Sequence, residues 1–154
     1  MNVHDFLHRH DVGYELLYHT PTHDAQRLAQ AVSESGHHVA KTVLLKSDAD
    51  HLLAVVPATH TIDLADAKQL LIADYLELAS EEELASRFPD CERGAIPPFG
   101  SQYGMTTLVD ESLAEAEEIV FEGNTHDEAV RMRFADYFEL EKPVVTHLSH
   151  PEAC

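Results

Sequence analysis

The sequence predicts an α/β domain (α+β mixed) in which a mixed, barrel-like β-sheet is flanked by short helices. Several short apolar runs are typical of strands, and segments with apolar residues three and four positions apart are typical of helices. The two kinds of segment are interspersed, which favours a mixed sheet with peripheral helices. Because the chain has 154 residues, 44% of them hydrophobic, and no repeat or linker, we expect a single domain over residues 1–154.

Apolar spacing and capping residues define the expected elements of the N-terminal half. Asn2 is a suitable N-cap for the first helix, and Gly36 is a suitable C-terminal stop for the second. The segment 51–56 is apolar almost throughout, which indicates a strand buried on both faces. The expected elements are a helix at 3–10, a strand at 14–18, a helix over the apolar positions 25 to 32, and strands at 39–45 and 51–56.

In the C-terminal half, the helix starts are the clearest signals. Asp63 precedes apolar residues at helical spacing, and Ser80 with Glu83 forms a capping box. Residues 88–104 contain three prolines and two glycines before Gly104, so we expect a shaped loop that is long enough to be functional. The expected elements are helices at 64–71 and 81–88, strands at 75–79, 105–109, 119–121 and 130–134, a turn or short helix within 110–118, a helix at 135–140 and an extended segment at 143–145.

The chain is strongly acidic. It contains 28 acidic against 10 basic residues, a formal net charge of -18. Such a chain repels polyanions at long range, whereas nucleic-acid-binding proteins normally carry a basic patch. A nucleic-acid substrate therefore requires a local positive site or high salt that screens the field. An acidic surface also fits a halophilic host.

The sequence shows no sign of a membrane or of a secretory route. No apolar run approaches the ~20 residues that cross a bilayer, and residues 1–5 lack the basic and apolar regions of a signal peptide. Cys91 and Cys154 are too few for a disulfide framework, so reduced thiols are expected. The expected location is the cytoplasm, without a membrane partner.

One lysine lies within the apolar strand expected at 39–45. Alternation places Lys41 on the same face as Val39, Val43 and Leu45. An unpaired ammonium is costly to bury, so Lys41 must either extend to the edge of the sheet or meet an anion in a cleft. Taken alone, the pattern favours extension to the edge.

Short motifs in a fixed order change that preference. They are Ala40-Lys41-Thr42-Val43-Leu44-Leu45, Leu53-Ala54-Val55-Val56-Pro57-Ala58, Gly94-Ala95-Ile96-Pro97-Pro98-Phe99-Gly100 and Val109-Asp110. Their order and spacing resemble the YbaK/prolyl-tRNA-synthetase-associated editing domain family, over roughly residues 18 to 146. The resemblance implies a mixed, barrel-like sheet flanked by helices, and hydrolysis of the ester that joins a wrong amino acid to the 3′ end of tRNA.

The resemblance also implies roles for individual residues. Lys41 matches the family's near-essential lysine, and Gly94 with Pro98 matches its glycine-to-proline loop. A lysine can hold a phosphate or other polar groups of the substrate, and a glycine lets a backbone N–H approach the ester carbonyl as negative charge develops there. No general base is required, because held water can attack an activated ester. The predicted catalytic residues are Lys41 and Gly94, and the predicted substrate-binding residues of the loop are Pro97, Pro98, Phe99 and Gly100.

Three further residues are predicted to contact the substrate. His126 lies where some members of this family place a substrate-facing histidine, although a solvated turn position is an equal alternative. Asn124 is assigned with it, while asparagine is also common in turns with a left-handed φ. Thr42 follows the lysine as in the bacterial trans-acting and synthetase-inserted branches. A compact pocket excludes larger cognate residues, so alanine or cysteine is the expected misacylated amino acid.

Other functions are compatible with the same residues. A non-catalytic protein of this fold could bind tRNA ends, nucleotides or a synthetase. The 12 histidines make a metal-binding protein a third alternative. No His-Glu-x-x-His pattern or cysteine pair supports a zinc site, so no metal or cofactor is predicted. Cys91 is a poor nucleophile candidate, since its acidic neighbours disfavour a thiolate. The predicted partner is the 3′ end of mischarged tRNA, with an aminoacyl-tRNA synthetase as a second candidate.

Overall fold

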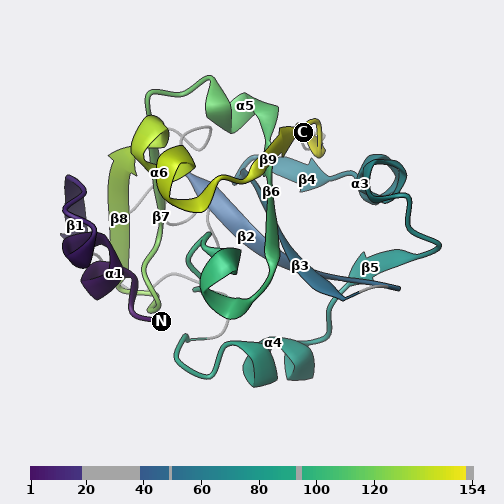
Figure 1. Ribbon diagram of the computed structural model, residues 1–154, viewed down its shortest axis with the longest axis horizontal. Coiled ribbons are helices and arrows are strands. Elements are labelled where there is room, and N and C mark those ends of the chain that lie inside the picture. The colour runs from purple at the N-terminus through teal and green to yellow at the C-terminus, as the bar shows by residue number, and fades with distance from the viewer. Residues whose placement is uncertain (19–38, 49, 93–94, 152–154) are drawn as a thin grey trace.

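The computed structural model describes residues 1–18, 39–48, 50–92 and 95–151, which are arranged as Figure 1 shows. The strands are β1 (Tyr14–Tyr18), β2 (Ala40–Ser47), β3 (His51–Pro57), β4 (His60–Ile62), β5 (Leu76–Leu78), β6 (Thr106–Asp110), β7 (Glu118–Glu122), β8 (Glu128–Arg133), β9 (Val144–Thr146) and β10 (Ser149–Pro151). The helices are α1 (Val3–Arg9), α3 (Leu64–Leu71), α4 (Glu81–Arg87), the 3-10 helix η1 (Gly100–Tyr103), α5 (Glu111–Ala114) and α6 (Phe134–Glu141). The helix expected over positions 25 to 32 lies outside the described residues.

The central sheet has five strands in the order β5-β2-β3-β6-β9. β2 pairs antiparallel with both β3 and β5, whereas β6 runs parallel to β3 and to β9. The sheet is therefore mixed, as predicted. β3 is buried along nearly its whole length, which confirms that its continuous apolar run is covered on both faces.

Two smaller sheets complete the described strands. β1, β8 and β7 form an antiparallel sheet, and β4 pairs with β10. Among the described residues, one isolated parallel bridge, Val39 to Val120, joins the backbones of the three-stranded and central sheets, which also pack through apolar side chains. The mixed α/β class is confirmed, but none of the described sheets closes into a barrel. One bridge does not make a continuous ladder between the two sheets. The barrel-like arrangement expected from the sequence is therefore not a closed barrel in the described residues.

Local capping explains where several helices begin. Asn2 accepts the N–H of Asp5, Asp63 accepts that of Asp66, and Ser80 forms the predicted capping box with Glu83. The 3-10 helix η1 was missed, because it lies inside a stretch that proline and glycine marked as a loop. All these helices are short, and none in the described ranges is long and apolar enough to cross a bilayer.

The central sheet packs on both faces. Leu44 of β2 joins Leu53, Phe88 and Ile96 on the face that carries α4 and the proline loop. Leu45 points the other way. It joins a cluster that includes Ala67 of α3 and Leu148 near the C-terminal strands. A further cluster around Phe99 lies between the central sheet, α1, α6 and the three-stranded sheet. The two faces of β2 thus belong to different cores.

Glu83 makes the stability of this fold sensitive to acid. Its hydrogen bond with His51, and then that from the Ser80 N–H, lower the Glu83 pKa from 4.5 to about 2. A carboxylate whose pKa is lower in the folded than in the unfolded protein contributes stability. This contribution is fully present above the pKa of the unfolded protein and is lost as the pH falls to the pKa of the folded protein. We expect the free energy of unfolding in urea to fall less for Glu83→Gln than for the wild type between about pH 5 and about pH 2.5. Glu82→Gln, in the same exposed turn, should behave as the wild type does. Equal losses in all three proteins would contradict the pairing with His51.

Candidate functional site

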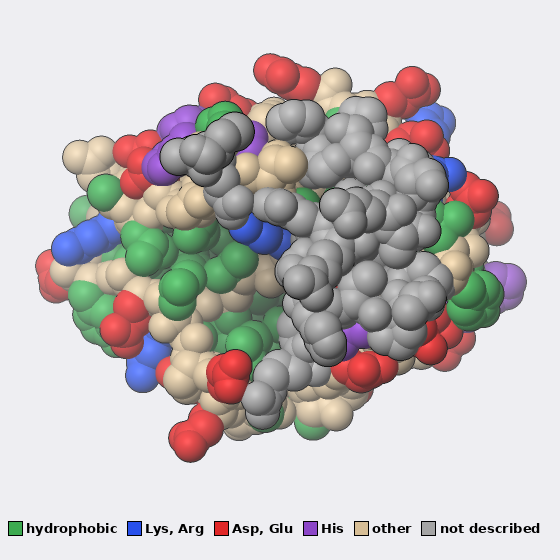
Figure 2. Space-filling model, turned by 180° about the vertical axis from the view of Figure 1, so that it is seen from behind, with side chains coloured by type: hydrophobic (Ala, Val, Ile, Leu, Met, Phe, Trp, Pro, Cys, Tyr) green, Lys and Arg blue, Asp and Glu red, His purple; other side chains and the backbone are tan. Residues whose placement is uncertain are grey.

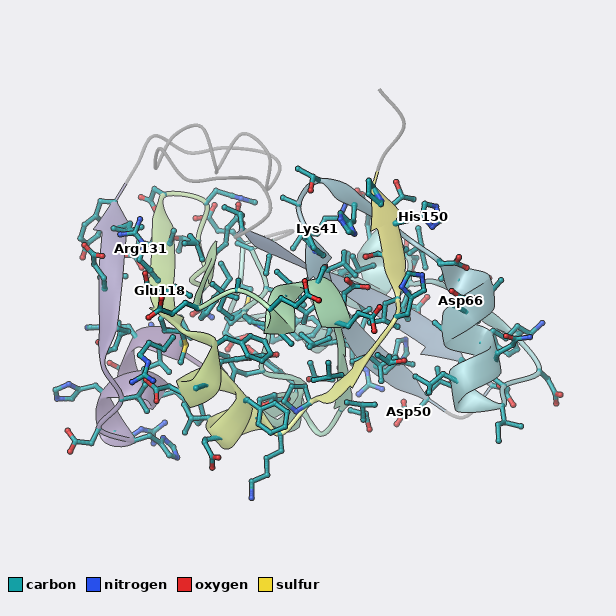
Figure 3. All side chains as sticks on the ribbon, turned by 90° about the horizontal axis from the view of Figure 1, so that it is seen from above. Lys41, Asp50, Asp66, Glu118, Arg131 and His150 are labelled. Carbon is teal, nitrogen blue, oxygen red and sulfur yellow. The ribbon has the colours of Figure 1, made fainter. Side chains whose placement is uncertain are left out.

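Lys41 lies near the start of β2, pairs with Val56 of β3, and is half-buried. The packing confirms the predicted alternation, because Val43 and Leu45 face the α3 cluster and Val39 packs with residues of the three-stranded sheet. Figure 3 shows Lys41 between that sheet and β10. Its side chain is thus on the face of the central sheet that carries α3 and β10.

A buried carboxylate lies in the same row of the sheet. Lys41 pairs with Val56 of β3. Val55 of β3 pairs with Val109 of the parallel strand β6, so the next residue of β6, Asp110, lies beside Val56 on the side away from Lys41. Asp110 is 1% exposed, and it accepts the N–H of Leu148 at 2.8 Å. Burial raises the pKa of Asp110, but hydrogen bonds, led by that from Ser112, lower it more, and the net pKa is below the usual value. This face of the sheet therefore holds an anion as well as the ammonium.

His60 and Ser149 extend the polar group around Asp110. His60 Nδ1 lies 2.8 Å from Ser149 Oγ, and both residues are buried. The Ser149 hydroxyl also hydrogen-bonds to Asp110. Sequence reasoning missed this pair, because the two residues are 89 positions apart. They meet only because the short strands β4 and β10 pair.

A second acidic residue, Glu122, lies at the end of β7, close along the chain to the bridge between the two sheets. Val39 and Val120 form an isolated parallel bridge, and alternation directs Lys41 of the central sheet and Glu122 of the three-stranded sheet, each two residues further on, to the same side as these valines. Glu122 is 8% exposed, and its Oε2 lies 3.0 Å from His126 Nδ1. The structure thus pairs the predicted His126 with a carboxylate that sequence reasoning missed. Alternation along β7 was the signal that could have found it.

Asn124 forms the turn after β7, with a φ of 73°. Its side-chain oxygen accepts the Val3 N–H at 2.9 Å, and its amide donates to Met1 O at 2.7 Å and to Cys91 Sγ at 3.3 Å. These contacts hold the turn against α1 and the loop after α4. They support the turn interpretation of Asn124, and contact with substrate stays a prediction.

The described part of the proline loop packs on the other face of the central sheet. Pro97, Pro98, Phe99 and Gly100 are all buried. A Cβ on Gly100 would lie 2.5 Å from Thr107 Oγ1, so the loop approaches β6 too closely for a larger residue without a shift. Lys41 and this part of the loop therefore do not share one face. Gly94, the predicted second catalytic residue, lies outside the described residues.

Two polar groups on the loop side have no hydrogen-bond partner within the described ranges. One is the buried Oγ1 of Thr42, and the other is the N–H of Ile96. The remaining amides of this stretch are occupied: Ala95 N–H donates to Glu92 O at 3.0 Å, Phe99 N–H to Pro97 O at 2.8 Å, and Gly100 N–H to Thr107 Oγ1 at 3.0 Å. Because proline has no N–H, Ile96 is the residue of 95–100 whose N–H is not taken up by another described residue, and it is the candidate donor to an ester carbonyl. Sequence reasoning did not single it out.

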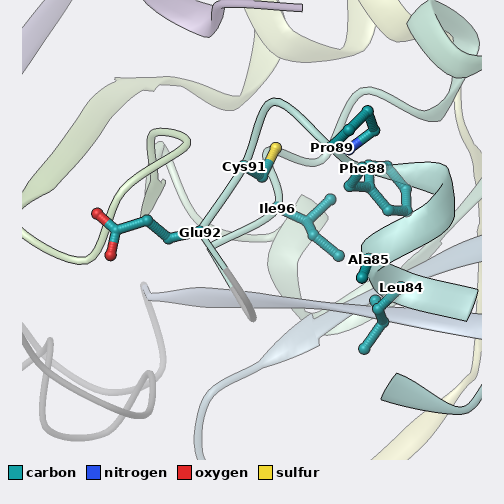
Figure 4. Close-up of a pocket in the computed structure, with 7 residues that line it drawn as sticks. All are labelled: Leu84, Ala85, Phe88, Pro89, Cys91, Glu92 and Ile96. Carbon is teal, nitrogen blue, oxygen red and sulfur yellow. The ribbon is translucent and has the colours of Figure 1, made fainter. Parts of the chain in front are cut away.

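A cavity of about 240 Å³ lies between α4 and the loop (Figure 4). Its lining consists of Leu84, Ala85, Phe88, Pro89, Cys91, Glu92 and Ile96. The volume and apolar walls suit a small side chain better than a nucleotide. The Cys91 thiol lies 3.7 Å from the hydroxyl of Tyr103, whose pKa is raised first by burial. No described imidazole or cation contacts the thiol, so nothing in this part of the chain supports a nucleophilic Cys91.

The polar side chains of the described residues do not gather as a metal centre, and two of the cations among them lie beside carboxylates. Within the described ranges, no three histidine, cysteine, aspartate or glutamate side chains gather as metal ligands would. Arg131 is paired with Glu15 at 2.9 Å, and Lys46 lies 3.9 Å from Glu83. Figure 2 shows acidic side chains around the rim of the rear face, with scattered Lys and Arg.

Comparisons with solved structures agree with this architecture. The hypothetical protein APE2540 superposes with a TM-score of 0.88 at 19% identity, over 96% of this chain and 99% of that one. A candidate trans-editing enzyme for prolyl-tRNA synthetase superposes with a TM-score of 0.85 at 23% identity, over 96% of this chain and 94% of that one. At these identities, the likeness concerns the fold.

Sequence comparisons define the family. The model of the aminoacyl-tRNA editing domain matches residues 19–140. A curated relative, the multifunctional Ser/Thr-tRNA deacylase ProXp-y of Escherichia coli (strain K12), is 30% identical over 131 residues, which cover 79% of this chain and 78% of the relative. The resemblance predicted from the order of the motifs is confirmed. The chain belongs to the aminoacyl-tRNA editing domain family.

Proposed function

We propose that this protein is a trans-acting aminoacyl-tRNA deacylase, which hydrolyses the ester bond of a mischarged tRNA. The observation that carries the proposal is the position of Lys41, a half-buried cation on the face of the central sheet that also holds the buried Asp110. In a chain with a net charge of -18, such a cation is a local site for the anionic 3′ end. Membership of the editing family over residues 19–140 supports the same reaction.

In this mechanism, Lys41 binds and orients the substrate and does not attack it. The ammonium holds the terminal phosphate or the ribose hydroxyls, while a loop N–H, from Gly94 or Ile96, stabilises the carbonyl oxygen as a water attacks. The tetrahedral intermediate then breaks the ester bond, and the ribose oxygen leaves with the proton that the water gives up. Because Lys41 is near the start of β2, a substrate at this end of the sheet can contact groups from both faces.

His126 is the proposed contact for the aminoacyl group or for the attacking water. Its Nδ1 lies 3.0 Å from Glu122 Oε2, so this carboxylate would pair with a protonated imidazole and leave Nε2 to face the substrate. Thr42 and the loop residues 97–100 are proposed to shape the site around them. Since Phe99 and Gly100 are in the core, they act by holding the backbone rather than by contact.

The proposed substrates are esters of small amino acids. The curated relative is named for Ser/Thr-tRNA, so serine and threonine join alanine and cysteine as candidates. A synthetase is the proposed partner, because a chain with a net charge of -18 is expected to bind tRNA weakly by itself. The candidate editing enzyme of the same fold is described for prolyl-tRNA synthetase, which makes that synthetase the first one to test.

A deacylation screen tests the proposal. Release of the amino acid is followed with time from tRNAs mischarged with alanine, serine, threonine, cysteine or proline, with and without prolyl-tRNA synthetase. We expect serine or threonine to be released fastest, and the synthetase to raise the rate at low tRNA concentration. If no ester is cleaved at any salt concentration while tRNA still binds, the protein is a non-catalytic binding module of this fold.

A further inference from the structure

Tyr137 of α6 reaches the proline loop from within the core. Its hydroxyl donates to Pro98 O at 2.7 Å, and its ring packs against that of Phe99, with centroids 5.3 Å apart. The residue is 0% exposed. Burial, and then the nearby Glu141 carboxylate, raise the Tyr137 pKa well above 10.0, so the phenol stays protonated and keeps donating.

Glu141, one turn further along α6, holds the residues that follow. Its carboxylate accepts the Ser101 N–H at 2.9 Å, the Ser101 hydroxyl at 2.6 Å and the Thr107 hydroxyl at 2.6 Å. Thr107 Oγ1 in turn accepts the Gly100 N–H at 3.0 Å. Since Tyr137 and Glu141 are at i and i+4, they lie on one face of the helix. That face therefore ties down the loop backbone from residue 98 to residue 101.

The hydrogen bonds of Glu141 are not needed to fill the core, because an apolar side chain could pack at this position. Glu141 is 8% exposed, and a buried carboxylate contributes less to stability than an apolar side chain of the same volume, because it has to be desolvated. Its two oxygens are satisfied by three donors, all of them from the loop or from the start of β6. What such a network does provide is one defined backbone geometry. Ile96, whose N–H donates to no other described residue, is two residues before the carbonyl that Tyr137 holds.

We propose that helix α6 sets the catalytic geometry of the proline loop, with Tyr137 and Glu141 as its positioning residues. The inference rests on the proposed function, in which a loop N–H stabilises the carbonyl oxygen. Neither residue touches the substrate. Both act through the backbone of residues 96–101, whose placement decides how well that N–H meets the developing charge. A misplacement of about 1 Å can lower an enzymatic rate by about 100-fold.

The test compares Tyr137→Phe and Glu141→Gln with Glu139→Gln, an exposed carboxylate on the same helix. Deacylation is measured well below each variant's unfolding midpoint, so that all proteins are folded. We expect kcat to fall by about 10- to 100-fold for both positioning variants, with KM for the tRNA unchanged and with Glu139→Gln equal to wild type. Amide hydrogen exchange at Gly100 and Ser101 should become faster in Glu141→Gln, and this readout does not depend on activity.

Each result separates this inference from the proposed function. If wild-type protein deacylates tRNA and both variants keep its kcat while their midpoints fall, α6 has only a structural role and the inference is wrong. Ser101→Ala removes the hydroxyl donor to Glu141 at an exposed residue. It therefore tests the same network even if the Glu141→Gln variant does not fold. It should lower kcat as well, and the double variant with Glu141→Gln should lose little more than the single one. If the wild type cleaves no mischarged tRNA, the proposed function fails first, and the inference falls with it.

Discussion

Replacing Lys41 with alanine is expected to lower kcat/KM for deacylation by about 100-fold or more, with the fold intact. The change removes a half-buried ammonium from a face of the central sheet that retains the buried Asp110, so the site becomes more negative and repels the 3′ end of the tRNA. The measurement is the initial rate of amino acid release from the best substrate of the screen, alongside thermal unfolding of both proteins.

Lys46 provides the matched control on the same strand. It lies five residues after Lys41, so alternation puts it on the opposite face, and its ammonium is 3.9 Å from Glu83. Lys46→Ala removes the same charge from the chain and is expected to stay within about twofold of the wild-type rate. If both variants lost activity equally, net charge rather than position would explain the effect. If Lys41→Ala kept full activity, Lys41 would have no part in the mechanism.

Lys41→Arg separates charge from shape. It keeps the cation but replaces a compact ammonium with a planar, larger guanidinium, so a rate between those of wild type and Lys41→Ala is expected. A fully active arginine variant would show that any cation suffices at this position.

Phe99→Ala is expected to lower the free energy of unfolding by about 3–5 kcal/mol. The ring is 0% exposed and lies at the centre of an aromatic cluster, with centroids 5.2 Å from Phe6, 5.8 Å from Phe121 and 5.3 Å from Tyr137. Truncation leaves a cavity between α1, α6 and the three-stranded sheet, because rings on separate elements cannot all move to fill it. Urea unfolding at neutral pH measures the loss.

Phe138 of α6 is the control for this truncation. It is 40% exposed, and Phe138→Ala is expected to cost less than about 1 kcal/mol. This comparison also decides what Phe99 does. A Phe99→Ala variant of wild-type stability that no longer bound substrate would restore the substrate-contact role predicted from the sequence and would contradict the packing described for the loop.

Local signals account for the elements that were predicted well. Asn2, Asp63 and the Ser80–Glu83 capping box each cap a helix at the expected residue, because a cap is formed by residues only three positions apart. The same holds for β3, whose continuous apolar run is itself the evidence of two covered faces. The class of the fold follows from such segments and their order along the chain.

Pairing over long distances explains what was missed. β4 and β10 have three residues each, too few for a periodic pattern, and they exist because they pair with each other. The His60–Ser149 contact depends on that pairing. Whether a barrel-like sheet closes is likewise a matter of tertiary structure, since the number of strands in a sequence does not say whether the first and last of them form a ladder.

By itself, the sequence determined the mixed α/β class, the face on which Lys41 lies and, through the order of its motifs, the editing family. These depend on alternation, capping and residue identity, which are properties of short segments. Only the tertiary structure decided that residues 97–100 pack in the core on the opposite face, that Glu122 pairs with His126, and that Tyr137 and Glu141 hold the loop. These contacts join segments far apart in the chain, and they form only when sheets and helices pack together.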